Sequence, residues 1–199
     1  MQIMEIGIAV LVAGIVMVLH EFPKSLFFFC CAPAEEKRKL RGKIFKLHQY
    51  IDPVGLLLSV TSCAGFSKPF MFRVRSQKKN LMMGISGFCV LIFLFLSAVY
   101  MLRTKYGLVA LQVDEIGLWQ IAEQLFWIYL AILSGSMFLV NLFPVSVFDM
   151  GLLIAGTSAS RYFRIVQMDT VIKIILLLAI ALDIIRYFTV CGVEGLLAL

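Results

Sequence analysis

The residues of this chain best able to do chemistry are three ionisable side chains inside an otherwise apolar stretch, His20-Glu21-Phe22-Pro23-Lys24. Residues four apart on a helix share a face. The pattern H-E-x-x-H uses that face to present two imidazoles to a zinc ion, with the glutamate as general base for the metal-bound water. Here the second histidine is replaced by Lys24, and a protonated lysine has no lone pair for a metal. Taken alone, the cluster is more typical of a helix end at a membrane interface.

A second polar cluster interrupts a later apolar region, and its sequence is Asn141-Leu142-Phe143-Pro144-Val145-Ser146-Val147-Phe148-Asp149-Met150-Gly151. Three shorter segments lie between the two clusters: Tyr50-Ile51-Asp52-Pro53-Val54-Gly55, Gly65-Phe66-Ser67-Lys68-Pro69-Phe70 and Ser86-Gly87-Phe88. In this order, the set resembles the motifs of the site-2 protease family of intramembrane zinc proteases, in its compact bacterial branch. The corresponding family patterns are N-L-L-P-x-x-x-x-D-G, I-D-P-I-G, G-x-A-K-P-V and A-G-P.

The resemblance implies a role for each matching residue. His20 and Asp149 would be metal ligands, and Glu21 would be the general base. The segment Lys68-Pro69-Phe70 would form the edge of a small hairpin that holds an extended substrate or partner. The other matching residues would be structural, and so would Lys24, which departs from the pattern: these are Lys24, Asp52, Pro53, Asn141 and Pro144.

The departures from the family pattern fall on the metal site. Lys24 replaces a ligand, Pro23 lies inside the ligand motif, and Met150 replaces the glycine after the ligand Asp149. A proline inside a helix removes a backbone N–H and crowds the preceding turn. His20 and Asp149 alone would give zinc two protein ligands, where a catalytic site normally has three. An atypical third ligand could come from His48, or from the thiols of Cys30 and Cys31.

The composition indicates a membrane protein. Apolar residues make up 61% of the 199 residues, charged residues make up 15%, and the mean hydropathy is +0.97. A soluble domain usually has about a quarter charged residues. The net charge of +6 does not indicate nucleic-acid binding, because six of the 18 basic residues lie within positions 37–46, between apolar segments. Basic loops of this kind set membrane topology and face anionic lipid headgroups.

The apolar pattern predicts an all-α polytopic fold with four transmembrane helices, one re-entrant segment and a small β-hairpin near 68–72. The expected spans are 3–19, extending toward 31, then 81–102, 118–154 and 171–190, with breaks at 134–136 and 141–149 inside the third. The first span lacks the features of a cleaved signal peptide, so we expect it to be retained. Residues 1–160 would form the family-like core, and 161–199 the last helix and tail.

Charge asymmetry predicts how these elements are oriented. If the short apolar stretch 51–66 dips into the membrane and returns, both basic clusters, at 37–46 and 73–79, lie in the cytosol. The N-terminus and C-terminus then both lie outside, in a multi-pass cell-membrane protein. A re-entrant segment must be buried against protein, because its backbone polar groups cannot face lipid unpaired.

These observations lead us to expect a catalytically inactive pseudoprotease that binds a membrane partner, such as a single-span protein or a transmembrane peptide, without a cofactor. The ammonium of Lys24 would stand where zinc stands in the family and pair with Asp149. Alternatively, Lys24 snorkels to the cytosolic interface. Two other functions stay open: an active zinc metalloprotease with an atypical third ligand, and a membrane protein of unrelated ancestry, such as a small transporter subunit.

Overall fold

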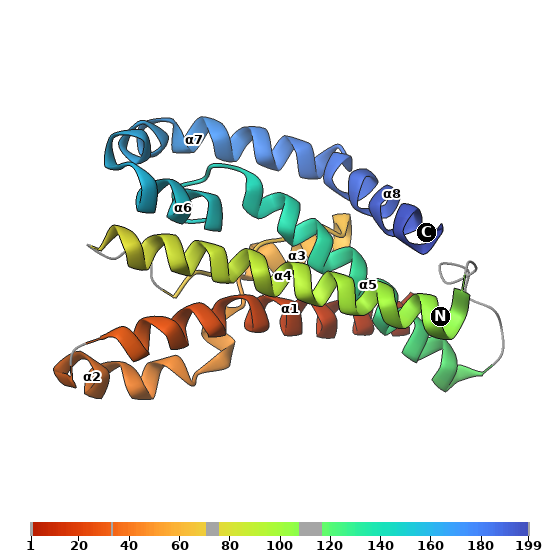
Figure 1. The fold of residues 1–199 in the computed structure, drawn as a ribbon. Helices are drawn as coiled ribbons and strands as arrows, with labels where there is room; N and C mark the ends of the chain where they lie inside the picture. Colours follow the sequence, from red (N-terminus) through yellow and green to blue (C-terminus); the bar gives the residue numbers. More distant parts are fainter. Residues whose placement is uncertain (1, 33, 71–75, 108–116, 199) are drawn as a thin grey trace.

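The computed structural model describes residues 2–32, 34–70, 76–107 and 117–198, and it is a bundle of helices (Figure 1). The helices, in chain order, are α1 (Gln2–Cys31), α2 (Ala34–Ile44), the 3-10 helix η1 (Leu47–Tyr50), α3 (Pro53–Ser62), α4 (Gln77–Tyr106), α5 (Leu118–Leu142), α6 (Asp149–Thr157), α7 (Ala159–Ala181) and α8 (Ile184–Ala198).

Three of the helices are long and apolar enough to cross a membrane. They are α1, α4 and α5, and the bent pair formed by α7 and α8 makes a fourth if it counts as one span. In Figure 1 the N-terminus and the C-terminus lie at the same end of the bundle, while α2 and the start of α4 lie toward the other end. The chain is therefore built as a multi-pass membrane protein.

The last span differs from the continuous helix expected over 171–190. The helical region begins earlier, at Ala159, and it breaks between α7 and α8 with a bend of 60°. Asp183 lies at the break with a φ of 55°. Aspartate adopts this left-handed conformation more readily than most residues, because its short side chain can bond locally.

The expected break at 134–136 is also absent, since α5 runs unbroken through Ser134, Gly135 and Ser136. The Ser134 hydroxyl donates to the Leu130 carbonyl within the helix at 2.5 Å, so it needs no water. The Ser136 hydroxyl lies 3.0 Å from the Thr189 hydroxyl of α8. Small residues here are a helix-packing surface, as is common between membrane helices.

The short apolar stretch after η1 folds back on itself. The ten-residue α3 is too short to cross a bilayer. The chain turns at Cys63, where φ is 50°, and it returns in extended form until the Lys68 N–H donates to the Tyr50 carbonyl at 2.9 Å. The two ends of the segment therefore meet, which is the geometry that a re-entrant segment requires.

The expected β-hairpin near 68–72 is not seen. Residues 68–70 are extended or bent without strand pairing, no strand occurs elsewhere in the described ranges, and 71–75 lies outside them. The backbone of the extended segment bonds instead to Tyr50, at the end of η1. The segment therefore pairs with the chain just before α3, and its described part forms no strand ladder of its own.

The main core lies between α1, α4 and α5, and it is made of aliphatic side chains such as Val16, Leu91 and Met137. Helices α4 and α6 approach very closely through glycines. A Cβ added to Gly84 would lie 2.8 Å from the Asp149 carbonyl oxygen, and one on Gly156 would lie 2.6 Å from the Leu81 nitrogen. This close approach fixes the start of α6 against the middle of the bundle.

The fold-back of residues 50–68 yields a topological prediction. Single cysteines introduced at Gly42 and at Ser76, in a background without the natural cysteines, should both react with a membrane-impermeant thiol reagent only from the cytosolic side. We expect this because the fold-back keeps both basic clusters, at 37–46 and 73–79, on the cytosolic side of the membrane. Labelling of the two positions from opposite faces would mean that the segment crosses the membrane.

Candidate functional site

Five polar side chains from three separate elements meet in the interior of the bundle. His20, Glu21 and Lys24 come from α1, Asp149 is the first residue of α6, and Ser67 comes from the extended segment after α3. His20 and Asp149 are 0% exposed, Glu21 is 4% exposed and Lys24 is 7% exposed. We call these five residues the charge cluster.

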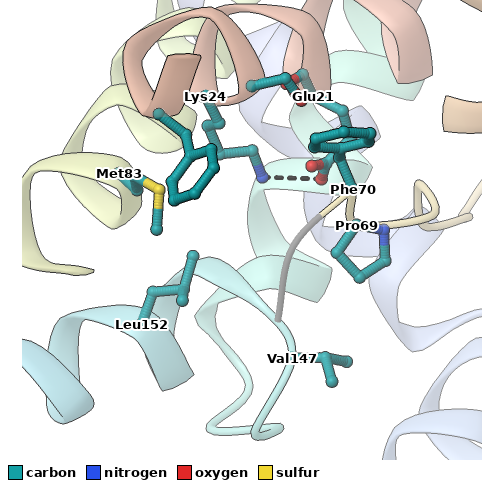
Figure 2. Close-up of a pocket in the computed structure, with 9 residues that line it drawn as sticks. Glu21, Lys24, Pro69, Phe70, Met83, Val147 and Leu152 are labelled. Carbon is teal, nitrogen blue, oxygen red and sulfur yellow. Dashed lines mark hydrogen bonds and ion pairs between the residues drawn. The ribbon is translucent and has the colours of Figure 1, made fainter. Parts of the chain in front are cut away.

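The ammonium of Lys24 is the centre of the charge cluster. Its nitrogen lies 2.8 Å from Oδ1 of Asp149, 2.7 Å from Oε1 of Glu21 and 3.3 Å from Nε2 of His20. Figure 2 shows the lysine nitrogen pointing at the glutamate carboxylate. The ion pair expected from the sequence is therefore present, and Lys24 does not snorkel to the interface.

His20 and Ser67 complete the hydrogen-bond network. Nε2 of His20 lies 2.7 Å from Oδ2 of Asp149, and Nδ1 lies 2.8 Å from the Ser67 hydroxyl. That hydroxyl donates its one hydrogen to Oε1 of Glu21 at 2.8 Å, so it accepts from His20. His20 and Ser67 thus link α1 to α6 and to the extended segment.

The cluster is positioned on α1 in spite of Pro23. The helix continues from Gln2 to Cys31 through the proline, so His20 and Lys24 keep the i, i+4 relation that places them on one face. The Ser25 hydroxyl donates to the Glu21 carbonyl at 3.1 Å. This is a local i, i−4 bond within the helix; the carbonyl that loses its N–H partner to Pro23 is that of Leu19.

The second sequence cluster positions Asp149. The Asn141 side chain donates to the Met137 carbonyl at 2.9 Å, and its own oxygen accepts from the Asp149 N–H at 3.4 Å. α5 ends at Leu142, before Pro144, and α6 begins at Asp149. The glycine displaced by one residue in the family pattern also has a packing reason, because a Cβ on Gly151 would lie 2.2 Å from the Val145 carbonyl oxygen.

Asp52 and Pro53 start α3, and two glycines fold the return segment against it. The Asp52 carboxylate accepts from the N–H groups of Val54 and Gly55, both at 2.9 Å, and Pro53 occupies the first helical turn. This is a standard helix N-cap. A Cβ on Gly55 would lie 2.0 Å from the Phe66 carbonyl oxygen, and one on Gly65 would lie 2.3 Å from that of Gly55. The backbone next to Ser67 is thereby held against α3.

Gly87 of α4 makes room for the Asp149 carboxylate. A Cβ at this position would lie 2.2 to 2.6 Å from the three carboxyl-group atoms of Asp149. The sequence indicates Gly87 only as a partial motif match, and Ser67 is not predicted as a site residue. The one signal for Ser67 is the serine that stands where the family pattern has alanine.

The predicted partner-binding residues lie beside the cluster and not inside it. Pro69 and Phe70 line a small cavity next to Glu21 and Lys24 (Figure 2). Lys68 and Pro69 also line a groove of about 370 Å³ toward α7, which includes Asp52, Phe66, Phe148, Lys173 and Leu177. The groove has an apolar floor and charged residues among its lining.

Two of the three alternative third ligands are exposed. His48 is exposed in η1, Cys30 is exposed near the end of α1, and the side chain of Cys31 lies outside the described part. Within the described ranges, no group of three or more His, Cys, Asp or Glu side chains is arranged to hold a metal ion.

The residues present do not fit a zinc ion. The ammonium of Lys24 already lies within hydrogen-bond distance of both carboxylates and within 3.3 Å of His20 Nε2. A divalent cation among the same atoms would meet a like charge within a few ångströms, and lysine cannot ligate while it is protonated. The donor set is therefore suited to hydrogen bonds from an ammonium.

No protein-family model, curated protein sequence or solved structure matches this chain. What the protein does must therefore be inferred from the chemistry of the charge cluster and its surroundings.

The buried ion pair predicts a strong interaction between two distant positions. Lys24→Met alone or Asp149→Leu alone should each destabilise the protein by about 3–5 kcal/mol, because each strands a buried charge. The double variant should recover much of the loss, because it removes both members of the pair and strands neither charge. The measurement is denaturant-induced unfolding in detergent. Strictly additive effects would contradict the pair.

An exposed ion pair provides the matched control for these variants. Lys105 pairs with Glu123 between α4 and α5, and both side chains are more than a third exposed. Lys105→Met should therefore cost between 0 and about 1 kcal/mol in the same assay. A loss as large as that of Lys24→Met would show that the assay does not distinguish buried from exposed charges.

The close approach of Gly87 to Asp149 generates a separate prediction. Gly87→Ala should destabilise the protein by about 1–3 kcal/mol, because a methyl group would displace the buried carboxylate. Gly7→Ala is the control, since a Cβ there meets nothing within 4 Å. It should be neutral or stabilising by up to about 1 kcal/mol through helix propensity. In unfolding curves, Gly87→Ala should lower the free energy of unfolding, and Gly7→Ala should leave it unchanged or raise it.

Proposed function

We infer that this chain is a site-2-protease-like membrane protein without peptidase activity, which binds a membrane partner through the extended segment at Lys68-Pro69-Phe70. The supporting observation is the Lys24 ammonium, which lies 2.8 Å from Asp149 and 2.7 Å from Glu21. In the family that the motifs resemble, the equivalent carboxylates bind and serve a zinc ion. Here the Lys24 ammonium hydrogen-bonds to the carboxylate oxygens that a zinc ion would need.

The position of the Lys24 charge supports the same proposal. A site with one aspartate, one glutamate and a divalent ion is neutral overall. In the charge cluster the Lys24 ammonium stands in place of that ion, within hydrogen-bond distance of both carboxylates. Replacing the metal ion by an ammonium removes the metal-bound water that a general base would activate. Glu21 is then a partner for a cation.

The partner surface is the groove beside the charge cluster. Its floor is apolar, with Phe66, Phe148 and Leu177, and it carries Lys68 and Lys173. The Asp169 carboxylate accepts from the Ser146 N–H at 2.8 Å and pairs with Lys173 at 2.6 Å, so α7 is tied to the loop before α6. Because Lys173 is already paired and Asp52 lies in the same lining as Lys68, this composition suits a transmembrane or juxtamembrane peptide with apolar side chains. In the membrane, 51–66 would be re-entrant and both termini outside.

The alternative is an active zinc protease with an atypical third ligand. It would require Lys24 to lose its proton or leave the cluster, although the side chain is buried and its ammonium donates to two carboxylates. Among the described candidates for a replacement ligand, His48 and Cys30 are exposed. The geometry therefore favours the pseudoprotease.

Zinc analysis of the purified protein tests this proposal. The wild-type chain should carry far less than one zinc per chain after purification in zinc-containing buffer. Lys24→His should acquire about one, because it restores the i, i+4 pair of imidazoles opposite Asp149 and exchanges an ammonium for a ligand. Lys24→Met is the control that removes the charge without adding a ligand, and it should stay low. About one zinc in the wild type would overturn the proposal.

Glu21 provides an independent test with a different readout. Cleavage of single-span membrane substrates should be absent from the wild type and from Glu21→Gln alike, because there is no metal-bound water to deprotonate. Cleavage that Glu21→Gln abolishes would establish the active protease instead.

A further inference from the structure

We propose that a groove between α1 and α2 is a binding site for one anionic phospholipid. The groove has a volume of about 550 Å³ and is lined by Phe29, Lys37, Arg38 and Phe45. The headgroup phosphate lies between Lys37 and Arg38, and the upper part of an acyl chain lies against Phe45. This site is separate from the charge cluster and does not depend on the function proposed for it.

The groups in the groove have the same order as the parts of a phospholipid. The Lys37 ammonium lies 6.0 Å from the centre of the Phe29 ring, near the end of α1. The Phe45 ring lies 6.1 Å from the Phe22 ring, two turns earlier in α1. Seven helical residues separate Phe22 from Phe29, which is about 10 Å along the axis. The end of the groove at Lys37 and the end at Phe45 therefore lie at different levels along α1, and the exposed Lys43 and Lys46 flank Phe45.

The length of α1 and the charges that follow it place the Lys37 end of the groove at the headgroup level. The apolar span covers 28 residues, which is about 42 Å. The hydrocarbon core is only about 30 Å thick, so α1 is about 12 Å longer than the core. The basic residues that follow α1 at 37–46 indicate that its C-terminal turns, with Phe29, are the part at the headgroup level. The basic cluster at 37–46 marks this end as cytosolic, and the cytosolic leaflet carries the anionic lipids.

The exposed side chains around the groove match both the headgroup and the acyl chain of a phospholipid. Arg38 is exposed and Lys37 is half-buried, so both can reach a phosphate, which arginine binds through its planar fork. Phe45 is 59% exposed and Leu47 is 48% exposed immediately after α2. A free phosphate would use the two cations but would leave these apolar side chains uncovered. An anionic phospholipid satisfies both sets.

Lipid titration with native mass spectrometry tests the site. Phosphatidylglycerol or phosphatidylcholine is added to the full-length protein in detergent, and bound lipids are counted. The wild type should bind one phosphatidylglycerol in clear preference to phosphatidylcholine. K37Q/R38Q should weaken that binding about thirtyfold. The control is R161Q/R164Q, which removes two exposed arginines at the start of α7 and should bind like the wild type.

Two more measurements distinguish a lipid site from general surface charge and from a phosphate site. Phe45→Ser keeps both cations and should weaken phosphatidylglycerol binding, whereas millimolar inorganic phosphate should not displace the lipid. Equal binding of the two lipids by the wild type would overturn the proposal without any variant. Equal weakening by K37Q/R38Q and R161Q/R164Q would mean that lipid binding depends only on general surface charge. Displacement of the lipid by inorganic phosphate would mean that the site binds phosphate alone. Either result would overturn the proposal.

Discussion

The structure depends on holding one ammonium between two carboxylates in the middle of an apolar bundle. None of these groups could be buried alone, because an unpaired charge in such surroundings is very costly. Lys24 therefore requires Asp149 to arrive from a segment 125 residues away, with its nitrogen 2.8 Å from the carboxylate. It also requires Glu21 on the same turn of α1. Each partner constrains a different helix, so the interaction links α1 to α6.

Several local features of the fold can be understood as serving this interaction. Asn141 accepts the Asp149 N–H, which fixes where α6 begins. Gly87 leaves space on α4 for the carboxylate, and Gly84 lets the Asp149 backbone approach the same helix. Every buried side-chain nitrogen and oxygen among the described residues has a hydrogen-bond partner. A buried polar network is stable only when all its members are satisfied in this way.

How much the sequence could predict depended on whether the determining contact was local or distant. The spans α1 and α4 followed from apolar runs, and the Lys24–Asp149 contact followed from two motifs taken together. The Asp183 break was missed because an aspartate in an apolar helix does not reveal a left-handed φ. The unbroken α5 was missed because Ser134 bonds within its own helix, which composition does not show.

The hairpin and the role of Ser67 depended on distant contacts. Residues 65–68 match a family motif that is expected to form a hairpin strand. In the structure they pack against α3, and their backbone bonds to Tyr50, which lies before that helix. Ser67 looks like a conservative replacement of alanine until its distances to His20 and Glu21 are known, 2.8 Å in both cases. No periodicity or spacing in the chain reports such a contact.

The position of Ser67 has a consequence for any molecule that docks on the extended segment. One hydroxyl joins the backbone of that segment to His20 and to Glu21, so the segment cannot shift without changing hydrogen bonds inside the membrane domain. If a peptide bound in the groove and shifted this segment, its binding would be thermodynamically linked to the hydrogen bonds of the charge cluster. Such coupling is reciprocal: a bound peptide that favours one arrangement is itself bound more tightly by that arrangement. In the pseudoprotease that we propose, binding of a peptide in the groove would thereby change the hydrogen bonds of the charge cluster.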